Sequence, residues 1–431
     1  MAEKFSRDTI CPRRDTNSTT DTKCTLVREQ SRPKEGGKEA WLTVIGSFFV
    51  WYSSYGVINS FGFFQDYYQN DFLKSTAPST ISFIGTLQIA LMNSLSTVSG
   101  AICDTHGIRY LYMASGTCTA IALLALSFSR PVISHTFLSQ GLLMGCAIAF
   151  GVQPSLTVVG QHFKHKRALT MGIVSSGSSI GGLCFTIMFE RLRPTIGFPW
   201  TMRIAALKVL ACYSFALWVS TSKPTRNPIK LSTLLDFRGF LDARYAVLAV
   251  ACWIANLGLY VPGYQIKSYA HDAFHGVAIG NYLLPIMLGS SIPGMIIGGL
   301  LGDLLGRLNC VWPVILNSGF LCLSLWLLAP SLPIVVLFTC LYGFGFGVYV
   351  AVLPSAVTQI TPDNKIGARM GAFYSIAAVS SLIGAPIGSA LIRRDDAGHA
   401  IGGEEGYKGL IAFAVSIACL LHVLWMCADT W

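Results

Sequence analysis

The sequence predicts an all-α integral membrane protein whose twelve transmembrane helices form two pseudo-symmetric six-helix bundles. Apolar residues make up 52% of the 431-residue chain and charged residues only 12%, a balance too apolar for a water-soluble domain. Stretches of about 20 apolar residues, the length that crosses a bilayer, recur along the chain. A loop pattern also repeats at a constant offset, which indicates two related halves.

Six apolar stretches lie before residue 221, each bounded by charge, proline or glycine clusters. Residues 1–40 precede them and are polar, with no apolar run after a basic start, so they predict a disordered cytosolic tail and no secretory signal. A charged loop ends the second stretch, and a basic run at 162–167 separates the fourth from the fifth. The N-terminal bundle, 41–220, is therefore expected to contain helices at 41–63, 79–102, 110–129, 132–160, 168–189 and 203–220.

The longest polar connection inside the chain is residues 221–244, which carries five basic residues and two prolines. We expect it to be a cytosolic linker between the bundles. A second charged loop, near residue 303, separates the eighth stretch from the ninth. The C-terminal bundle, 245–431, is expected to contain helices at 245–265, 281–302, 309–329, 332–358, 369–392 and 409–428.

The two halves share a loop with glycine, acid, glycine and arginine. Asp303 lies 199 positions after Asp104, and Met370-Gly371 lies at the same offset from Met171-Gly172. The full set of loop residues is Gly100, Asp104, Gly107 and Arg109 in the first copy, and Asp303, Gly306 and Arg307 in the second. Glycine permits a tight turn there, and the charged groups can hydrogen-bond to neighbouring helix ends.

The net charge of +10 comes from Lys and Arg in the tail and in short segments between the apolar stretches. Such residues set membrane orientation, and they are more frequent on the side that holds the tail and the linker. We therefore expect a multi-pass protein of the plasma membrane with both termini in the cytosol. No nucleic-acid partner is expected, because the role of basic residues in setting membrane orientation already explains their positions.

Two like halves joined by these paired loops resemble the major facilitator superfamily, a resemblance that covers residues 40–428. It implies a secondary transporter that works by alternating access around a central site. It also implies that Asp104 and Asp303, with the other loop residues, latch a cytosolic gate. The alternative for each loop is a plain turn with a solvated acid.

A narrower resemblance rests on two segments. Glu35-Gly36-Gly37 with residues 56–65, and residues 162–178, are similar to the fungal branch of the monocarboxylate porter family. The implied substrate is a small organic acid. However, Asn59 stands where animal proton-coupled members have a lysine, and residues 288–294 lack their acid and arginine. A coupling proton therefore stays open, and efflux of a secondary metabolite and a non-transporting nutrient sensor remain alternatives.

The superfamily places helices one, four, seven and ten around the cavity, so polar and aromatic side chains at mid-membrane on those helices are candidate substrate contacts. Each of them could instead bond helices together. Lys208 is the main ionisable residue within an apolar stretch; it either attracts an anionic substrate or snorkels to the outer surface. The candidate contacts are Tyr55, Asn59, Gln153, Asn256, Tyr260 and Tyr349.

No enzyme, cofactor or metal site is expected. The thirteen cysteines are scattered without a Cys-x-x-Cys pair, so they are interpreted as small packing residues. The expected partners are the lipid bilayer and a small-molecule substrate.

Overall fold

The computed structural model describes residues 36–73, 76–163, 165–222, 237–274, 280, 282–327, 331–361, 366–393 and 406–414. All of them belong to one compact unit, Glu35–Trp431. At a few positions inside helices, Asp104 among them, only the backbone is described. The predicted tail and linker lie largely outside these residues, so those two predictions stay untested, except that the first helix already begins at Lys38.

The described chain is helical, with no strand in the residues given above. The part of the chain that holds the first six predicted spans begins with α1, which Ser60 separates from α2. Gly107 ends α3 with a φ of 77° that favours glycine. Two π-helical stretches interrupt this part. The elements are α1 Lys38–Asn59, α2 Phe61–Tyr67, η1 Tyr68–Phe72, α3 Pro78–His106, α4 Arg109–Ser127, α5 Ile133–Thr136, η2 Phe137–Leu143, α6 Met144–His162 and α7 Arg167–Val219.

The helix α7 holds two predicted spans. It has 53 residues, which would make a straight helix of about 80 Å, far longer than the roughly 30 Å of a bilayer core. The chain turns within it at Gly197, whose φ is 80°, between Pro194 and Pro199. The predicted helices 168–189 and 203–220 are therefore its two arms.

The C-terminal part follows the same plan of long apolar helices. Its elements are η3 Phe237–Leu241, α9 Ala243–Leu259, α10 Val261–Ala273, α11 Leu283–Leu305, α12 Arg307–Leu321, η5 Cys322–Leu327, α13 Leu332–Gln359 and α14 Ile366–Ala390. Ten helical segments of the described chain are long and apolar enough to cross a membrane, α7 counted once. The last predicted span, 409–428, is described only to residue 414, so the count of twelve stays a prediction.

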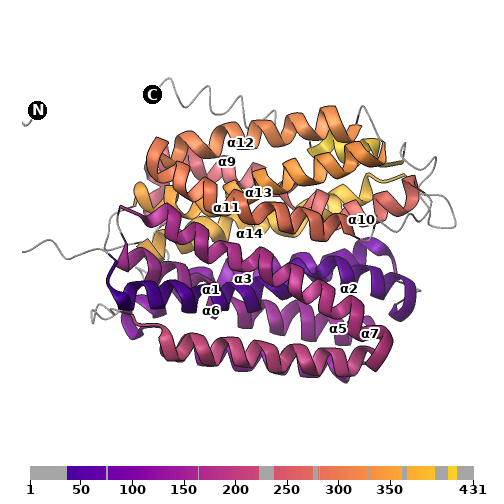
Figure 1. Ribbon diagram of the computed structural model, residues 1–431, viewed down its shortest axis with the longest axis horizontal. Coiled ribbons are helices and arrows are strands. Elements are labelled where there is room, and N and C mark those ends of the chain that lie inside the picture. The colour runs from indigo at the N-terminus through magenta and orange to yellow at the C-terminus, as the bar shows by residue number, and fades with distance from the viewer. Residues whose placement is uncertain are drawn as a thin grey trace, which may run out of the picture. The chain divides into compact units, whose positions relative to one another are not determined.

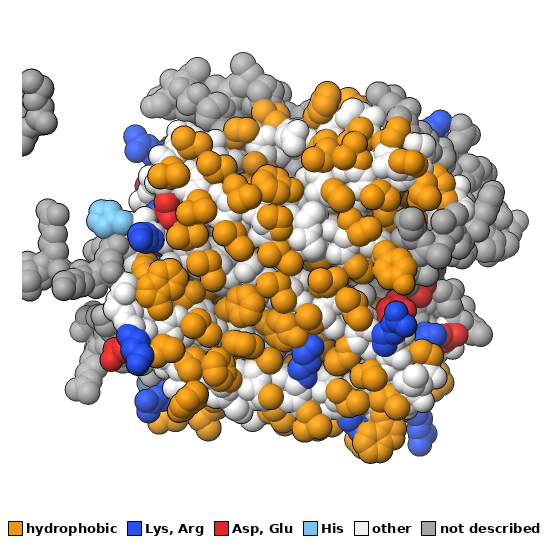
Figure 2. All heavy atoms as spheres, viewed as in Figure 1, with side chains coloured by type: hydrophobic (Ala, Val, Ile, Leu, Met, Phe, Trp, Pro, Cys, Tyr) orange, Lys and Arg blue, Asp and Glu red, His pale blue; other side chains and the backbone are white. Residues whose placement is uncertain are grey.

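In Figure 1, α1 to α7 and α9 to α14 form two groups that lie side by side. Contacts between the groups run mainly along two helix pairs, α3 with α14 and α7 with α11. Apolar side chains cover the flank shown in Figure 2, and charged side chains gather mainly toward its two ends. Large aromatic residues such as Trp218 and Phe320 are exposed, as expected where lipid is the solvent.

Glycine allows the helices to pack at backbone contact. A Cβ atom on Gly181 would meet the carbonyl oxygen of Tyr52, whereas one on Gly289 would meet nothing within 4 Å. Both glycines lie inside long helices, so the two positions have the same secondary structure. They differ only in how closely a neighbouring helix packs against them. Small residues at such contacts let helix backbones approach closely within a membrane.

Gly181→Val is therefore expected to destabilise the protein, because overpacking a tight contact costs about 1–3 kcal/mol. Gly289→Val is the control and should leave stability nearly unchanged. The measurement is the melting temperature of the purified variants in detergent by intrinsic fluorescence. Equal melting temperatures for the two variants would contradict the packing role of Gly181.

Candidate substrate site and gate

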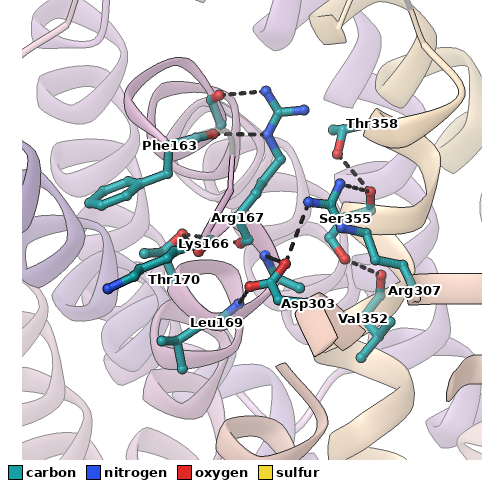
Figure 3. Close-up of polar contacts among 12 residues, drawn as sticks. Phe163, Lys166, Arg167, Leu169, Thr170, Asp303, Arg307, Val352, Ser355 and Thr358 are labelled. Atoms are coloured by element: carbon teal, nitrogen blue, oxygen red, sulfur yellow. Dashed lines mark hydrogen bonds and ion pairs between the residues drawn. The ribbon is translucent and has the colours of Figure 1, made fainter. Parts of the chain in front are cut away.

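Asp303 joins α11 to the start of α7. Its carboxylate accepts hydrogen bonds from the backbone N–H groups of Ala168 at 3.1 Å and Leu169 at 2.9 Å (Figure 3). These are unpaired donors of the first turn of α7, where the helix dipole favours a negative charge. We call this end of the bundle the Asp303 end and the opposite end, where α7 turns, the Gly197 end.

Arg307 holds Asp303 in place. Its Nη2 donates to Asp303 Oδ1 at 3.4 Å and its Nη1 donates to the carbonyl oxygen of Ser355 on α13 at 3.2 Å. Both charged side chains are only 12% and 14% exposed, so their interaction is weakly screened by water. Gly306, with a φ of 99°, makes the turn that places the arginine beside the acid.

Arg167 is a functional candidate that sequence reasoning missed. It is 5% exposed and donates to the carbonyl oxygens of Phe163 at 3.0 Å and Gly160 at 2.9 Å. It thereby ties the end of α6 to the start of α7, next to the two N–H groups that Asp303 accepts. The sequence signal that could have indicated Arg167 is the basic run 162–167. Its histidines and lysines were interpreted as surface charge.

The first copy of the repeated loop is less fully described. Gly107 makes the expected turn, and the N–H of Ile108 donates to Ser222 Oγ at 3.4 Å. Arg109 is exposed and Gly100 is buried. The side chain of Asp104 lies outside the described part, so its gating role stays a prediction.

A small cavity of about 290 Å³ lies between α1, α3, α6 and α14. Two predicted contacts line it, Tyr55 and Gln153. Gln153 is 4% exposed, and its amide nitrogen has no hydrogen-bond partner, which is costly for a buried polar group unless a ligand or water satisfies it. Trp51 stacks on Tyr55 with ring centroids 4.5 Å apart and donates to Ser155 Oγ at 2.9 Å.

Other residues line the cavity that were not among the predicted contacts, and they include Trp51, Asn93 and Tyr374. Asn93 and Tyr374 come from α3 and α14, which the superfamily resemblance did not place at the cavity. Tyr374 is therefore a C-terminal side chain in a cavity built mainly by N-terminal helices. An aromatic residue in span eleven carries no sequence signal that separates it from ordinary packing.

The other predicted tyrosines extend this site. Tyr349 belongs to a buried apolar cluster, and Tyr55, Tyr260 and Tyr374 pack against that same cluster. Four tyrosines from α1, α13, α14 and the junction between α9 and α10 thus lie together, and we call Tyr55, Tyr260, Tyr349 and Tyr374 the tyrosine cluster. It brings three of the predicted contacts to one place.

Two predicted contacts are engaged within the protein. The Nδ2 atom of Asn256 donates to the carbonyl oxygen of Cys252 at 3.0 Å, and Cys252 Sγ lies 3.3 Å from the hydroxyl of Tyr349. Asn59 donates to the carbonyl oxygen of Ser178 at 3.2 Å, where α1 packs on α7. Asn59 lines neither described cavity, so the structure favours the helix-bonding alternative for it.

Contacts also close the site toward the Gly197 end. Phe61 and Tyr264 meet edge to face with centroids 5.7 Å apart, and a Cβ atom on Gly62 would meet Leu284 at 2.9 Å. On the other side of the cavity, Thr97 and Ser375 are hydrogen-bonded at 2.8 Å. The cavity is therefore enclosed between two sets of contacts that cross from N-terminal to C-terminal helices.

Lys208 packs against two aromatic rings. Its Nζ lies 4.2 Å from the ring centroid of Phe185 and 5.0 Å from that of Tyr52, where cation–π attraction holds the ammonium. It is absent from the lining of both described cavities. The structure therefore gives no support to attraction of an anionic substrate, and snorkelling stays a prediction.

Lys208→Met is accordingly expected to leave the KM for transport within about twofold, since the side chain does not reach the site. A lysine that attracted an anionic substrate would be worth far more, because an ion pair away from water is strong. The check is initial-rate transport at several substrate concentrations, corrected for the amount of protein in the membrane. A tenfold rise in KM would restore the anion-attracting role.

The arrangement is that of a solute carrier: a central aromatic cavity, helices long enough to cross a membrane, and charged contacts at one end. Within the described residues no group of three or more metal-binding side chains occurs. The family model of the Major Facilitator Superfamily matches residues 41–385. This chain belongs to the Major Facilitator Superfamily. It is thus a multi-pass membrane transporter.

Comparisons with individual superfamily proteins agree with this assignment. An MFS-type transporter of an Ophiocordyceps species is 33% identical over 86% of this chain and 82% of its own length. The fujikurins efflux protein of Gibberella fujikuroi is 30% identical over 90% of this chain and 82% of its own length. The human organic anion transporter MFSD10 shares the fold, with a TM-score of 0.70 at 14% identity over 90% of this chain and 97% of its own.

These relatives narrow the expected function. The resemblance to the superfamily is confirmed, whereas the narrower resemblance to monocarboxylate porters finds no support in the names of the relatives. Those names refer to MFS-type transport and, for the Gibberella fujikuroi protein, to efflux of fujikurins.

Proposed function

We propose that this transporter exports a small, uncharged secondary metabolite by alternating access. The observation that carries the proposal is the chemistry of the central cavity. Its described lining offers aromatic rings, hydroxyls and amides, and includes no Asp, Glu, Lys, Arg or His. The names of efflux relatives support the direction of transport.

The same lining disfavours a carboxylate. A carboxylate buried without a partner costs several kcal/mol or more. Lys208 on the second arm of α7 lies over Phe185 and Tyr52 and does not line the cavity. A neutral ring system with hydroxyl or carbonyl groups loses much less water on entering. It can stack on Trp51 and Tyr55 and accept a hydrogen bond from Gln153.

The Asp303 end is proposed to be cytosolic, as the distribution of Lys and Arg predicts. In the described conformation Asp303 and Arg307 tie α11, α7 and α13 together there, which closes the path from the cytosol. Opening requires Ala168 and Leu169 to part from Asp303 as residues 41–220 and 245–431 rock apart. The metabolite then enters the cavity, and contacts such as Phe61 with Tyr264 separate to release it on the other side.

Export is tested by expressing the chain in a yeast strain that lacks its own efflux pumps. Cells are loaded with a panel of neutral aromatic metabolites and of carboxylates, and the loss of each compound is followed with and without a protonophore. We expect faster loss of neutral aromatic compounds and no change for carboxylates. Selective loss of carboxylates would favour the organic-acid function, and binding to purified protein without any transport would favour a nutrient sensor.

A further inference from the structure

A second cavity lies on the C-terminal side of the tyrosine cluster. It has an empty volume of about 470 Å³ and is lined from α9, α12 and α13. Most of its lining residues are buried, and small ones such as Ala255, Gly319 and Gly345 leave the space open. The volume open to a water-sized sphere is about 50 Å³, and about 10–15 Å³ of such volume holds one water molecule. The space can therefore take a group of a few carbon atoms.

The walls of this cavity are chemically apolar. Ser318 Oγ donates to the carbonyl oxygen of Val314 at 2.9 Å, and the hydroxyl of Tyr342 donates to the carbonyl oxygen of Leu259 at 3.0 Å. Both hydroxyl groups therefore already donate their hydrogen bonds within the protein. The central cavity differs, because there the amide nitrogen of Gln153 has no partner.

The two cavities share a wall of aromatic residues. Tyr349 and Phe346 line the second cavity. Both belong to the buried apolar cluster against which Tyr55 and Tyr374 of the first cavity pack. Phe346 also meets Tyr260 edge to face, with centroids 6.2 Å apart. This wall of aromatic side chains therefore lies between a polar chamber and an apolar one.

From this juxtaposition we infer that the substrate is amphipathic: a neutral ring bearing hydroxyl or carbonyl groups, with an apolar chain of several carbons. The ring lies between Trp51, Tyr55 and Gln153, and the chain passes the tyrosine cluster into the second cavity. The inference rests on the proposed function, since it assigns the polar end of the substrate to the same central site. It adds the second cavity as a determinant of specificity.

The test uses neutral 5-alkylresorcinols with chains from methyl to heptyl as probes. Binding to the full-length protein in lipid nanodiscs is measured against free aqueous ligand, with empty nanodiscs as the blank. For the unmodified protein we expect affinity to rise about three- to fourfold for each added methylene that enters the cavity. Beyond the length that the cavity holds, the rise should stop.

Two variants fill the second cavity from different helices, Ser318→Leu on α12 and Ala255→Leu on α9. Each is expected to keep the affinity for the methyl compound within about twofold and to lower that for the heptyl compound at least tenfold. Phe320→Leu, at a position of α12 that is 65% exposed, is the control and should change neither. Two variants guard against the failure of one to fold.

The outcomes separate the two proposals. An unchanged dependence on chain length in both variants, or an equal loss for the methyl and heptyl compounds, would overturn the role of the second cavity while leaving the export function standing. Failure of the unmodified protein to bind any resorcinol would overturn the polar site proposed for the function as well, and the chain inference with it.

Discussion

Asp303→Asn is expected to lower the transport rate at least tenfold in protein that reaches the membrane normally. The carboxylate accepts two backbone hydrogen bonds at the start of α7, and an amide can accept only one of them while its NH₂ group faces the other donor. A hydrogen bond to a charged group contributes about 1.5–3 kcal/mol, and the helix dipole adds about 0.3–2 kcal/mol. Losing about 2–4 kcal/mol from one conformation shifts the equilibrium between conformations by a factor of roughly 30 to 1,000.

The measurement combines the transport rate with accessibility to a membrane-impermeant thiol reagent of a cysteine introduced near the Asp303 end. The variant should label faster, because the closed conformation is less populated. Asp242→Asn is the control: Asp242 also accepts a backbone N–H at the start of a helix, from Arg244 at 3.2 Å, but on α9. Unchanged transport and labelling in Asp303→Asn would remove the latch role, and Asp104→Asn tests the same role in the first loop.

Gln153→Leu is expected to raise the KM for the exported metabolite about tenfold or more and to leave the protein as stable as before, or more stable. Leucine fills a similar volume and removes a buried amide nitrogen that has no partner within the protein, which relieves a cost of about 1–3 kcal/mol. The bound substrate loses a hydrogen bond at the same time. A variant that keeps its stability but binds substrate more weakly identifies a residue whose role is to bind the substrate.

The comparison is Gln140→Leu, which removes another buried glutamine. The amide nitrogen of Gln140 is likewise buried without a partner, but its Oε1 atom accepts a hydrogen bond from the hydroxyl of Tyr68 at 2.6 Å. Gln140→Leu strands that hydroxyl, so it should lower the melting temperature without changing KM. Both variants are measured by thermal unfolding in detergent and by concentration-dependent transport. If Gln153→Leu lost stability as Gln140→Leu does and kept its KM, Gln153 would be a packing residue.

The predicted residues fared differently for an identifiable reason. Tyr55, Gln153 and Tyr349 line the described cavities and Tyr260 lies beside them, and their role as substrate contacts stays a prediction. Asn59 lies on the same helix as Tyr55, yet it faces α7. A shift of four residues along a helix turns a side chain by about 40°, and the sequence does not state which neighbouring helix it meets.

The sequence alone was sufficient for the membrane class, the long apolar helices and the position of Asp303 in a repeated loop. Those features depend on composition and on spacing along the chain. The thickness of the bilayer core sets the length of an apolar helix, so such helices can be recognised from length and hydropathy alone. What Asp303 binds was decided only by the tertiary structure, because its partners are backbone N–H groups that every sequence possesses. The cavities were also decided only by the tertiary structure, because their walls come from helices far apart in sequence. The packing of those helices leaves the amide nitrogen of Gln153 without a partner. It also places the tyrosine cluster between a polar chamber and an apolar one.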